Sequence, residues 1–182
     1  MGHRKRLVRA IARLSPVEQT AAPISAAERR QLTVMFCDLV GSTALSARLD
    51  PEDMREIVGA YHQCVAELIE GAGGFVAKYM GDGVLAYFGY PQAHEDDAER
   101  AVRAGLAVAE ATRRLQTSEL LQVRIGLATG LAVVGDLIGS GAAQERGVVG
   151  ETPNLAARLQ TLAAPGTLVI ADNTRRQIGA LF

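Results

Sequence analysis

The sequence predicts an α+β domain in which helices cover one face of a mainly antiparallel β-sheet. Two observations lead to this fold class. Short apolar runs recur along the chain, and two of them flank Gly81-Asp82-Gly83, which is typical of a β-hairpin turn. Between the runs lie longer segments whose apolar residues recur at every third or fourth position, the spacing of one buried helical face.

Composition indicates one domain of ordinary size that builds its core from small aliphatic side chains. The chain has 182 residues, of which 48% are hydrophobic but only 4% aromatic, and it contains no tryptophan. A formal net charge of −1 argues against a general nucleic-acid-binding protein. No run approaches the roughly 20 apolar residues that a transmembrane helix needs, so no transmembrane segment is expected.

Residues 1–27 are expected to form a basic N-terminal segment and linker, and residues 28–182 the domain itself. The basic cluster Arg4-Lys5-Arg6 has no apolar signal-peptide core beside it. It could belong to a short amphipathic helix at a membrane surface, but a solvated lead-in or a partner contact is favoured. The two cysteines, Cys37 and Cys64, lie in apolar surroundings, which favours buried thiols in a reducing cytoplasm.

The first strand is expected over residues 31–37, where every position from Val34 to Cys37 is apolar. Such a run is typical of a strand that is buried on both faces. A helix then begins with Asp50 as N-cap and Pro51 at the first helical position. Its buried face is expected to hold Met54, Ile57, Val58, Tyr61, Val65 and Leu68.

A hairpin of residues 75–80 and 84–88 follows, and then a helix over residues 93–116. The cluster His94-Glu95-Asp96-Asp97 has the composition of a metal site. An acidic first helical turn is favoured instead, because it complements the helix dipole. The side chains expected to face the sheet are small, and they are Ala98, Val102, Gly105 and Ala109.

Two further strands are expected over residues 121–127 and 131–137, joined by a linker of residues 128–130. A helix then begins at Thr152-Pro153. Its buried face is expected to hold Leu155, Leu159 and Leu162. The last elements are a strand over residues 167–170 and a short helix over residues 173–179.

Two aspartates carry the chemical hypothesis. Asp38 ends the first strand, and Asp82 lies at the hairpin tip. If the two strands are neighbours, both carboxylates meet at one end of the sheet, where they could hold a hard divalent cation with waters and substrate phosphates. Taken singly, each aspartate could instead be a turn former or helix cap. Asn154 and Arg158 share a helical face that could bind an anion or be an ordinary exposed polar face.

Four blocks of sequence stand in a fixed order: FCDLVGST at residues 36–43, KYMGDG at 78–83, RIGLATG at 124–130 and VGETPNLAARL at 149–159. Together they resemble the class III nucleotidyl cyclases, the adenylyl and guanylyl cyclase catalytic domain. The resemblance covers residues 29–182 and implies a ferredoxin-like sandwich. The activity that it implies is conversion of ATP to 3′,5′-cyclic AMP and pyrophosphate in intracellular signalling.

The resemblance also implies a role for individual residues. Asp38 and Asp82, assisted by the Leu39 carbonyl, would hold two divalent cations per site, Mg²⁺ or Mn²⁺. Arg158 would meet the charge that builds on the phosphoryl oxygens in the transition state, and Asn154 would orient the ribose. The general base stays open among Asp38, water and the substrate itself.

Base recognition is expected at Lys78, whose ammonium group would donate to adenine N1 and so favour ATP over GTP. Gly147 stands where adenylyl cyclases usually have an Asp or Thr that reads the adenine amino group. Backbone atoms, Glu145 or Arg146 would have to take that role here. The other residues expected to bind substrate are Leu39, Gly41, Ser42 and Thr43.

A head-to-tail homodimer is implied as well, in which one subunit supplies Asp38 and Asp82 and the other supplies Lys78, Asn154 and Arg158. Family members usually continue into a hairpin with a triphosphate-binding lysine, and this chain ends without it. A longer parent protein could add a C-terminal regulatory or ATPase region. One alternative is a catalytically weak or inactive cyclase-like module that regulates an attached domain. Another is a diguanylate cyclase, but the Gly-Gly-Asp/Glu-Glu-Phe hairpin of that class is absent from the sequence.

Overall fold

The computed structural model describes residues 28–138 and 145–181, so the basic N-terminal segment expected at residues 1–27 lies outside the described part. The elements in chain order are β1 (Glu28–Leu39), α2 (Ser42–Ser46), α3 (Pro51–Gly71), β2 (Phe75–Met80), β3 (Gly83–Phe88), α4 (Asp97–Arg114), β4 (Val123–Ile138), β5 (Glu145–Val149), α5 (Glu151–Leu162), β6 (Thr167–Ile170) and α6 (Asp172–Ile178). The mixed α+β class expected from the sequence is confirmed.

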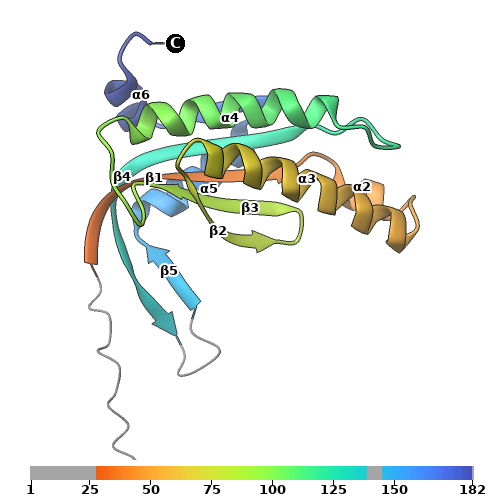
Figure 1. Ribbon diagram of the computed structural model, residues 1–182, viewed down its shortest axis with the longest axis horizontal. Helices are drawn as coiled ribbons and strands as arrows, with labels where there is room; N and C mark the ends of the chain where they lie inside the picture. The colour runs from red at the N-terminus through yellow and green to blue at the C-terminus, as the bar shows by residue number, and fades with distance from the viewer. Residues whose placement is uncertain (1–27, 139–144, 182) are drawn as a thin grey trace, which may run out of the picture.

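The sheet has six strands and is mainly antiparallel, as expected. Five strands follow the order β2-β3-β1-β4-β5, and β6 pairs with β4 in parallel. Strand β4 has two successive partners on this side, β6 along residues 124–127 and β5 along residues 133–138. Figure 1 shows the far ends of β4 and β5 projecting beyond the layer of helices as a two-stranded ribbon.

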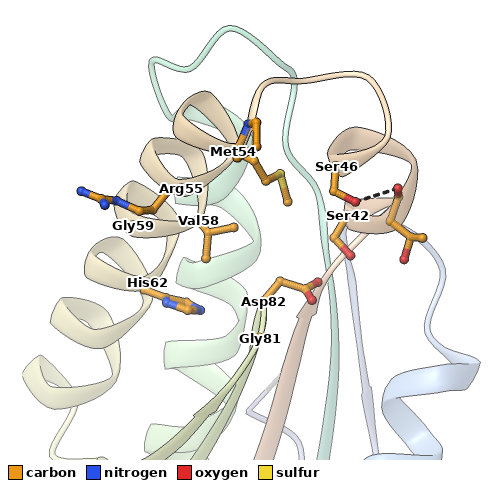
Figure 2. A pocket seen from close by; sticks show the side chains of 11 residues that line it. Ser42, Ser46, Met54, Arg55, Val58, Gly59, His62, Gly81 and Asp82 are labelled. Carbon is orange, nitrogen blue, oxygen red and sulfur yellow. Dashed lines mark hydrogen bonds between the residues drawn. The ribbon is translucent and has the colours of Figure 1, made fainter.

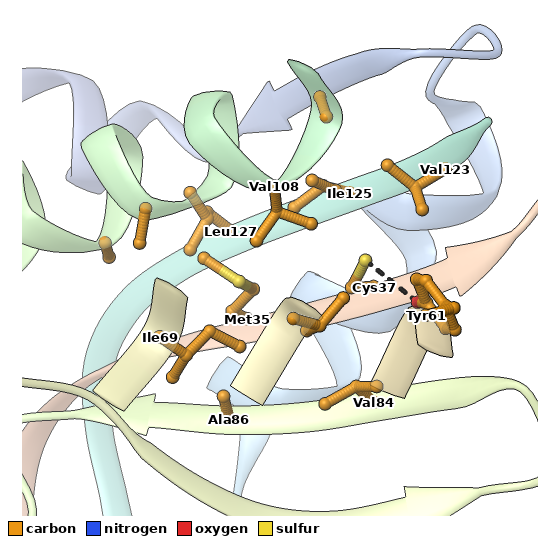
Figure 3. Close-up of a cluster of buried hydrophobic side chains, with 14 of the residues drawn as sticks. Met35, Cys37, Tyr61, Ile69, Val84, Ala86, Val108, Val123, Ile125 and Leu127 are labelled. Atoms are coloured by element: carbon orange, nitrogen blue, oxygen red, sulfur yellow. Dashed lines mark hydrogen bonds between the residues drawn. The ribbon is translucent and has the colours of Figure 1, made fainter. Parts of the chain in front are cut away.

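Helices α3 and α4 cover one face of the sheet (Figure 1). Because side chains alternate along a strand, Met35 and Cys37 of β1 both point to this face. They share one apolar core with Tyr61 of α3 and Val108 of α4 (Figure 3). The buried Tyr61 hydroxyl is paired with the Cys37 Sγ atom at 3.2 Å. Among the helices of the described residues, none combines the length and the apolar character that crossing a membrane requires.

Helix α5 lies on the opposite face of the sheet, so helices lie on both faces and not only on the one that the sequence indicated. A second, smaller apolar cluster is buried there, and it includes Val34 of β1, Ala128 of β4 and Ala156 of α5. These positions alternate with the core positions of the α3 and α4 face, as the two-residue period of a strand requires. The small side chains allow α5 to pack close to the sheet.

The prediction for the buried face of α5 is wrong for two of its three leucines, since only Leu159 is partly buried against the second cluster. Thr152, Pro153 and Ala156 are buried, whereas Leu155 and Leu162 are 36% and 75% exposed. The reason is the close approach of α5 to β4. A Cβ atom at Gly126 would lie 2.2 Å from the Ala156 carbonyl oxygen, so helix backbone and strand backbone are nearly in contact. At the closest approach only small side chains fit between them, and Leu155 and Leu162 turn outward.

The two strands expected over residues 121–127 and 131–137 are one continuous strand, β4. Thr129 and Gly130, expected in a linker, pair in register with Thr33 and Leu32 of β1. The Thr33 and Thr129 hydroxyls are hydrogen bonded at 2.8 Å, and a Cβ atom at Gly130 would meet the side chain of Thr152. The small residues therefore reflect close packing and not a turn. Strand β5 was not expected at all.

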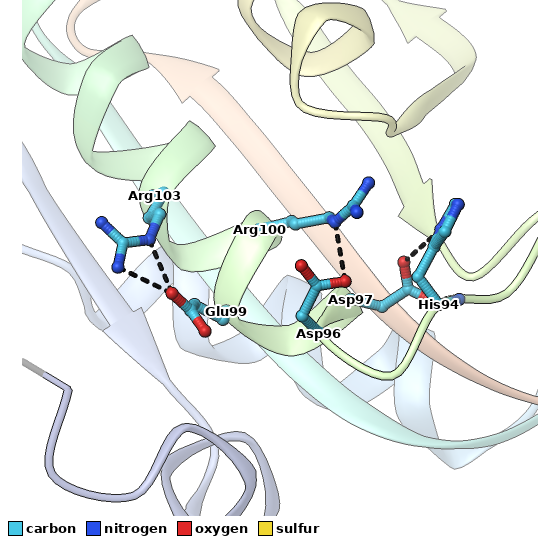
Figure 4. Close-up of polar contacts among 6 residues, drawn as sticks. All are labelled: His94, Asp96, Asp97, Glu99, Arg100 and Arg103. Carbon is cyan, nitrogen blue, oxygen red and sulfur yellow. Dashed lines mark hydrogen bonds and ion pairs between the residues drawn. The ribbon is translucent and has the colours of Figure 1, made fainter.

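The cluster of residues 94–97 was expected in the first turn of a helix, but α4 begins only at Asp97, so most of the cluster lies just before the helix (Figure 4). Asp97 accepts a hydrogen bond from the His94 backbone N–H at 2.7 Å and pairs with its ring Nδ1 at 3.2 Å. Asp96 pairs with Arg100 at 2.8 Å. The four residues expected to face the sheet from α4 are all buried. Asp96 and Asp97 therefore pair with neighbouring side chains at the start of the helix, which supports a structural role for the cluster.

Candidate active site

Asp38 lies at the end of β1, on the face that α5 covers. Its neighbours in the strand, Cys37 and Leu39, point into the core on the other face, so the alternation of β1 places the Asp38 carboxylate on the α5 side. There Gln160 of α5 donates a hydrogen bond from Nε2 to Asp38 Oδ2 at 3.4 Å. The carboxylate is therefore half-buried between the end of the sheet and a helix.

Asp82 is brought to Asp38 by the pairing of β3 with β1. Val84 is the register partner of Cys37, so the hairpin tip lies beside the end of β1. A Cβ atom at Gly83 would lie 3.6 Å from Asp38 Oδ1, and Gly83 is itself buried. Gly81 has a φ of 66°, a left-handed conformation that glycine adopts without strain. The glycines of the turn thus allow the two carboxylates to approach.

The two carboxylates influence each other strongly. Burial, together with the negative charge of Asp82, raises the pKa of Asp38 from 3.8 to about 6. Oxygen Oδ2 of Asp82 is buried and has no hydrogen-bond partner among the described residues. Two close carboxylates, one with an unpartnered buried oxygen, are a donor set that suits a hard divalent cation.

A fuller metal cage is absent from the described residues, where no group of three or more His, Cys, Asp or Glu side chains could hold an ion. This agrees with the way Mg²⁺ is usually held, since one or two carboxylates share the ion with waters and substrate phosphates. Leu39, whose carbonyl was expected to assist, ends β1 and is 2% exposed as a whole residue. The residues present therefore fit a substrate-dependent metal site.

A cavity of about 800 Å³ opens beside Asp82. Ser42 and Thr43 of α2 line it on one side, and α3 lines it on the other. Figure 2 shows Met54 and Val58 pointing from α3 toward Asp82. Helix α2 begins directly after Gly41, whose φ of 73° turns the chain sharply away from β1. The predicted Gly-Ser-Thr turn therefore borders the same space as Asp82.

Two residues near the carboxylates were missed by sequence reasoning. Arg124 of β4 is the register partner of Asp38, and its Nε is buried without a hydrogen-bond partner among the described residues. His62 of α3 packs against Tyr79 with tilted rings whose centroids are 4.5 Å apart, and it lines the same cavity as Asp82. Burial lowers the pKa of His62. Arg124 could have been found from the antiparallel register of its strand, whereas nothing in the local sequence marks His62.

The other predicted site residues are distributed over the rest of the fold. Asn154 and Arg158 are exposed on α5, and neither has a hydrogen bond or ion pair to the two aspartates in the described part of the chain. Lys78 lies on β2 opposite Leu85. Gly147 lies on β5 opposite Gly135. One chain thus joins Asp38, Asp82 and the Ser42-Thr43 turn, but it leaves Asn154 and Arg158 facing outward.

Comparison with protein families gives one match over most of the chain. The model of the adenylate and guanylate cyclase catalytic domain matches residues 24–179. Adenylate cyclase 1 of Rhizobium meliloti is 31% identical over 154 residues, which are 81% of this chain and 23% of that protein. An uncharacterized protein of the same organism is 35% identical over 158 residues, or 85% of this chain. The chain spans less than a third of the length of these relatives, 23% and 15% respectively.

Solved structures of similar fold include cyclases of both base specificities. The guanylyl cyclase Cya2 is 34% identical with a TM-score of 0.80, and the match covers 84% of this chain and 80% of that chain. The adenylyl cyclase CyaB from P. aeruginosa is 29% identical with a TM-score of 0.77, covering 84% and 82%. The fold expected from the sequence is therefore confirmed.

Proposed function

We propose that this chain, which belongs to the adenylate and guanylate cyclase catalytic-domain family, is an adenylate cyclase. In this proposal it converts ATP to 3′,5′-cyclic AMP and pyrophosphate in the cytoplasm. The observation that carries the proposal is the meeting of the Asp38 and Asp82 carboxylates at one end of the sheet. In this proposal residues 28–182 are the catalytic unit, and residues 1–27 precede it as a basic linker.

Asp38 and Asp82 would hold two divalent cations, Mg²⁺ or Mn²⁺, with the Leu39 carbonyl. When bound, such ions favour ionisation of the ribose 3′-hydroxyl and offset the negative charge of the triphosphate and the leaving pyrophosphate. The unpartnered Asp82 oxygen and the raised pKa of Asp38, which burial and the Asp82 charge cause, support this assignment.

Phosphate binding is assigned to the segment after β1 and to a residue of β4. The backbone and side chains of Ser42 and Thr43 border the cavity at Asp82, and Gly41 leaves room for a phosphate to approach. Arg124 adds a cation beside Asp38, with a donor that the described residues leave unpaired. A guanidinium group suits phosphate oxygens because its donors form a planar fork.

Asn154 and Arg158 are assigned to the site of a second subunit in a head-to-tail homodimer. Both side chains are exposed on α5, away from the carboxylates of their own chain. Exposed apolar residues near them, Leu155 at 36% and Leu131 at 66%, support an interface on this face. In the partner's site Arg158 would stabilise the charge that develops on the phosphoryl oxygens, and Asn154 would orient the ribose for in-line attack on the α-phosphorus.

ATP is proposed over GTP because of Lys78, which would donate to adenine N1, whereas guanine carries a donor at the same position. Gly147 offers no side chain to read the exocyclic amino group, so Lys78 carries the discrimination. We expect the chain to form cyclic AMP from ATP at least about tenfold faster than cyclic GMP from GTP. Replacing Lys78 by glutamate should lower this ratio at least about tenfold, because a carboxylate accepts hydrogen bonds from guanine.

Turnover of ATP and GTP with Mn²⁺ or Mg²⁺, measured by product formation at high protein concentration, tests this assignment. Arg103→Lys on the solvent side of α4 is the matched control, and its ATP-to-GTP ratio should stay that of the unaltered chain. An unaltered chain that forms only cyclic GMP would contradict ATP specificity. A chain that binds nucleotide without forming either product would favour the inactive regulatory module.

Mixing two inactive variants tests the shared site. Asp38→Ala and Arg158→Ala should each lose almost all activity as homodimers, because each removes one half of both sites. In a mixture, a mixed dimer has one site with an intact Asp38 and an intact Arg158. We expect equimolar mixing to recover about a quarter of the unaltered activity, because half of the dimers are mixed and each has one of two sites intact. Absence of recovery, with dimers present by light scattering, would contradict the assignment of Arg158 to the partner's site.

A further inference from the structure

Helix α5 packs so closely against β4 at Gly126 that the two backbones cannot move nearer to each other. A Cβ atom at Gly126 would lie 2.3 Å from the Gln160 backbone nitrogen and 2.9 Å from its Cα atom. Gly126 is the register partner of Phe36 in β1, two residues before Asp38. The backbone of Gln160 is therefore held in a fixed relation to the strand that carries the first aspartate.

The Asp38 carboxylate lies between this helix and the hairpin tip. Its Oδ2 atom accepts the hydrogen bond from Gln160 at 3.4 Å, and its Oδ1 atom faces Gly83, where a Cβ atom would lie 3.6 Å away. The two oxygens thus have different neighbours. A donor on Oδ2 turns Oδ1 toward the Asp82 turn, where a shared cation needs it.

The chemistry of the Gln160 side chain suits this task. A side-chain amide donates a hydrogen bond without adding charge. An arginine or lysine in its place would neutralise Asp38 and compete with a cation, and a glutamate would repel the carboxylate. A neutral donor orients the oxygen atoms without itself reducing the negative charge of the pair. Outer partners of metal-ligating carboxylates typically act in this way.

We propose that Gln160 is a positioning residue that orients the Asp38 carboxylate of its own chain for metal binding, and that α5 thereby connects the two sites of the dimer. The same helix presents Asn154 and Arg158 outward, so it contacts the metal carboxylate of one site and supplies polar residues to the other. The inference rests on the proposed function, and it adds a residue and a connection between sites that the family resemblance did not supply.

Mn²⁺ binding to the full chain, followed by electron paramagnetic resonance of the free ion, tests the positioning role without turnover. Gln160→Met keeps the length of the side chain and removes the donor. We expect the Kd for Mn²⁺ to rise about tenfold. Thr161→Ala, on the next position of α5, is the matched control and should leave the Kd unchanged. A Gln160→Met chain that binds Mn²⁺ as the unaltered chain does would overturn the proposal.

A purely structural role for Gln160 is separated by the mixed dimers. The reconstituted site takes its Asp38 from the Arg158→Ala chain and its Arg158 from the Asp38→Ala chain. We expect Gln160→Met to reduce the recovered activity about tenfold more when it is in the Arg158→Ala chain than when it is in the other. Equal losses in the two arrangements would overturn the proposal, because a distorted α5 would also displace Arg158. A different result is possible, in which mixing Asp38→Ala with Arg158→Ala recovers no activity while Gln160→Met still raises the Kd for Mn²⁺ about tenfold. That result would refute the shared site and support the positioning role of Gln160.

Discussion

Replacing Asp82 by asparagine is expected to reduce cyclic AMP formation more than about 1,000-fold, because the amide cannot supply the negative charge that holds the cations. Asparagine has nearly the same shape, so the hairpin turn should form as before. Initial rates at saturating Mn²⁺ and ATP measure the effect. Activity within tenfold of the unaltered chain would contradict a metal role for Asp82.

The same substitution should not lower the stability of the fold, and this distinguishes loss of chemistry from loss of structure. Burial and the Asp82 charge raise the pKa of Asp38 from 3.8 to about 6, so the folded state binds that proton more tightly than the unfolded state. The contribution of Asp38 to the free energy of unfolding therefore falls as pH rises from about 4 to about 6, and it stays lower above pH 6. Removing the Asp82 charge should lower the pKa of Asp38 and so reduce this loss of stability.

Thermal unfolding between pH 4 and pH 8 tests this expected effect of Asp82→Asn on stability. At pH 7.5 the Tm of Asp82→Asn should equal or exceed that of the unaltered chain, and its decline between pH 4 and pH 6 should be shallower. Asp53→Asn, an exposed position in the first turn of α3, controls for the loss of one negative charge. If the Tm of Asp82→Asn lies several degrees below the Tm of the unaltered chain and that of Asp53→Asn, Asp82 stabilises the turn.

Replacing Gly126 by alanine should have the largest effect on stability of any single methyl group added to the sheet. The new Cβ atom would lie 2.2 Å from the Ala156 carbonyl oxygen and 2.3 Å from the Gln160 nitrogen, both backbone atoms of α5. Because a backbone cannot rotate away, the whole helix must shift. We expect the free energy of unfolding to fall by about 3 kcal/mol and the Tm by about 6–12 °C.

The matched control is Gly59→Ala on α3, where a Cβ atom would meet nothing within 4 Å. Alanine is the better helix former by about 1 kcal/mol, so this variant should be at least as stable as the unaltered chain. Denaturant unfolding at pH 7.5 compares the two. Because α5 carries Asn154, Arg158 and Gln160, a folded Gly126→Ala chain should also lose most of its activity. If the Gly126→Ala chain is as stable as the Gly59→Ala chain, α5 and β4 do not pack as closely at Gly126 as described.

Local sequence patterns predicted the structure correctly where residues close together in the chain determine the backbone conformation. The Gly81-Asp82-Gly83 turn and the Asp50-Pro51 helix start formed as expected, and the acidic segment before residue 100 led into a helix, although α4 begins at Asp97 and not at residue 93. In each, the residues that determine the conformation are adjacent or one helical turn apart. The same holds for the two carboxylates, because each is marked by its own strand end or turn.

Contacts between distant segments were not visible in local patterns. Thr129-Gly130 was expected in a linker, although pairing with β1 and packing of Thr152 keep it in an extended strand. Leu155 and Leu162 of α5 were expected inside but are exposed, because the close approach of that helix to Gly126 admits only small side chains there. Periodicity marks an apolar face, but it does not state which surface that face meets.

By itself, the sequence determined the fold class, the order of the main elements and the identity of the two carboxylates, because these depend on short-range spacing and turn chemistry. The tertiary structure alone decided that Arg124 and Gln160 flank Asp38 and that Asn154 and Arg158 face outward. These relations join residues far apart in the chain, and they arise from strand register and from how closely one backbone can approach another.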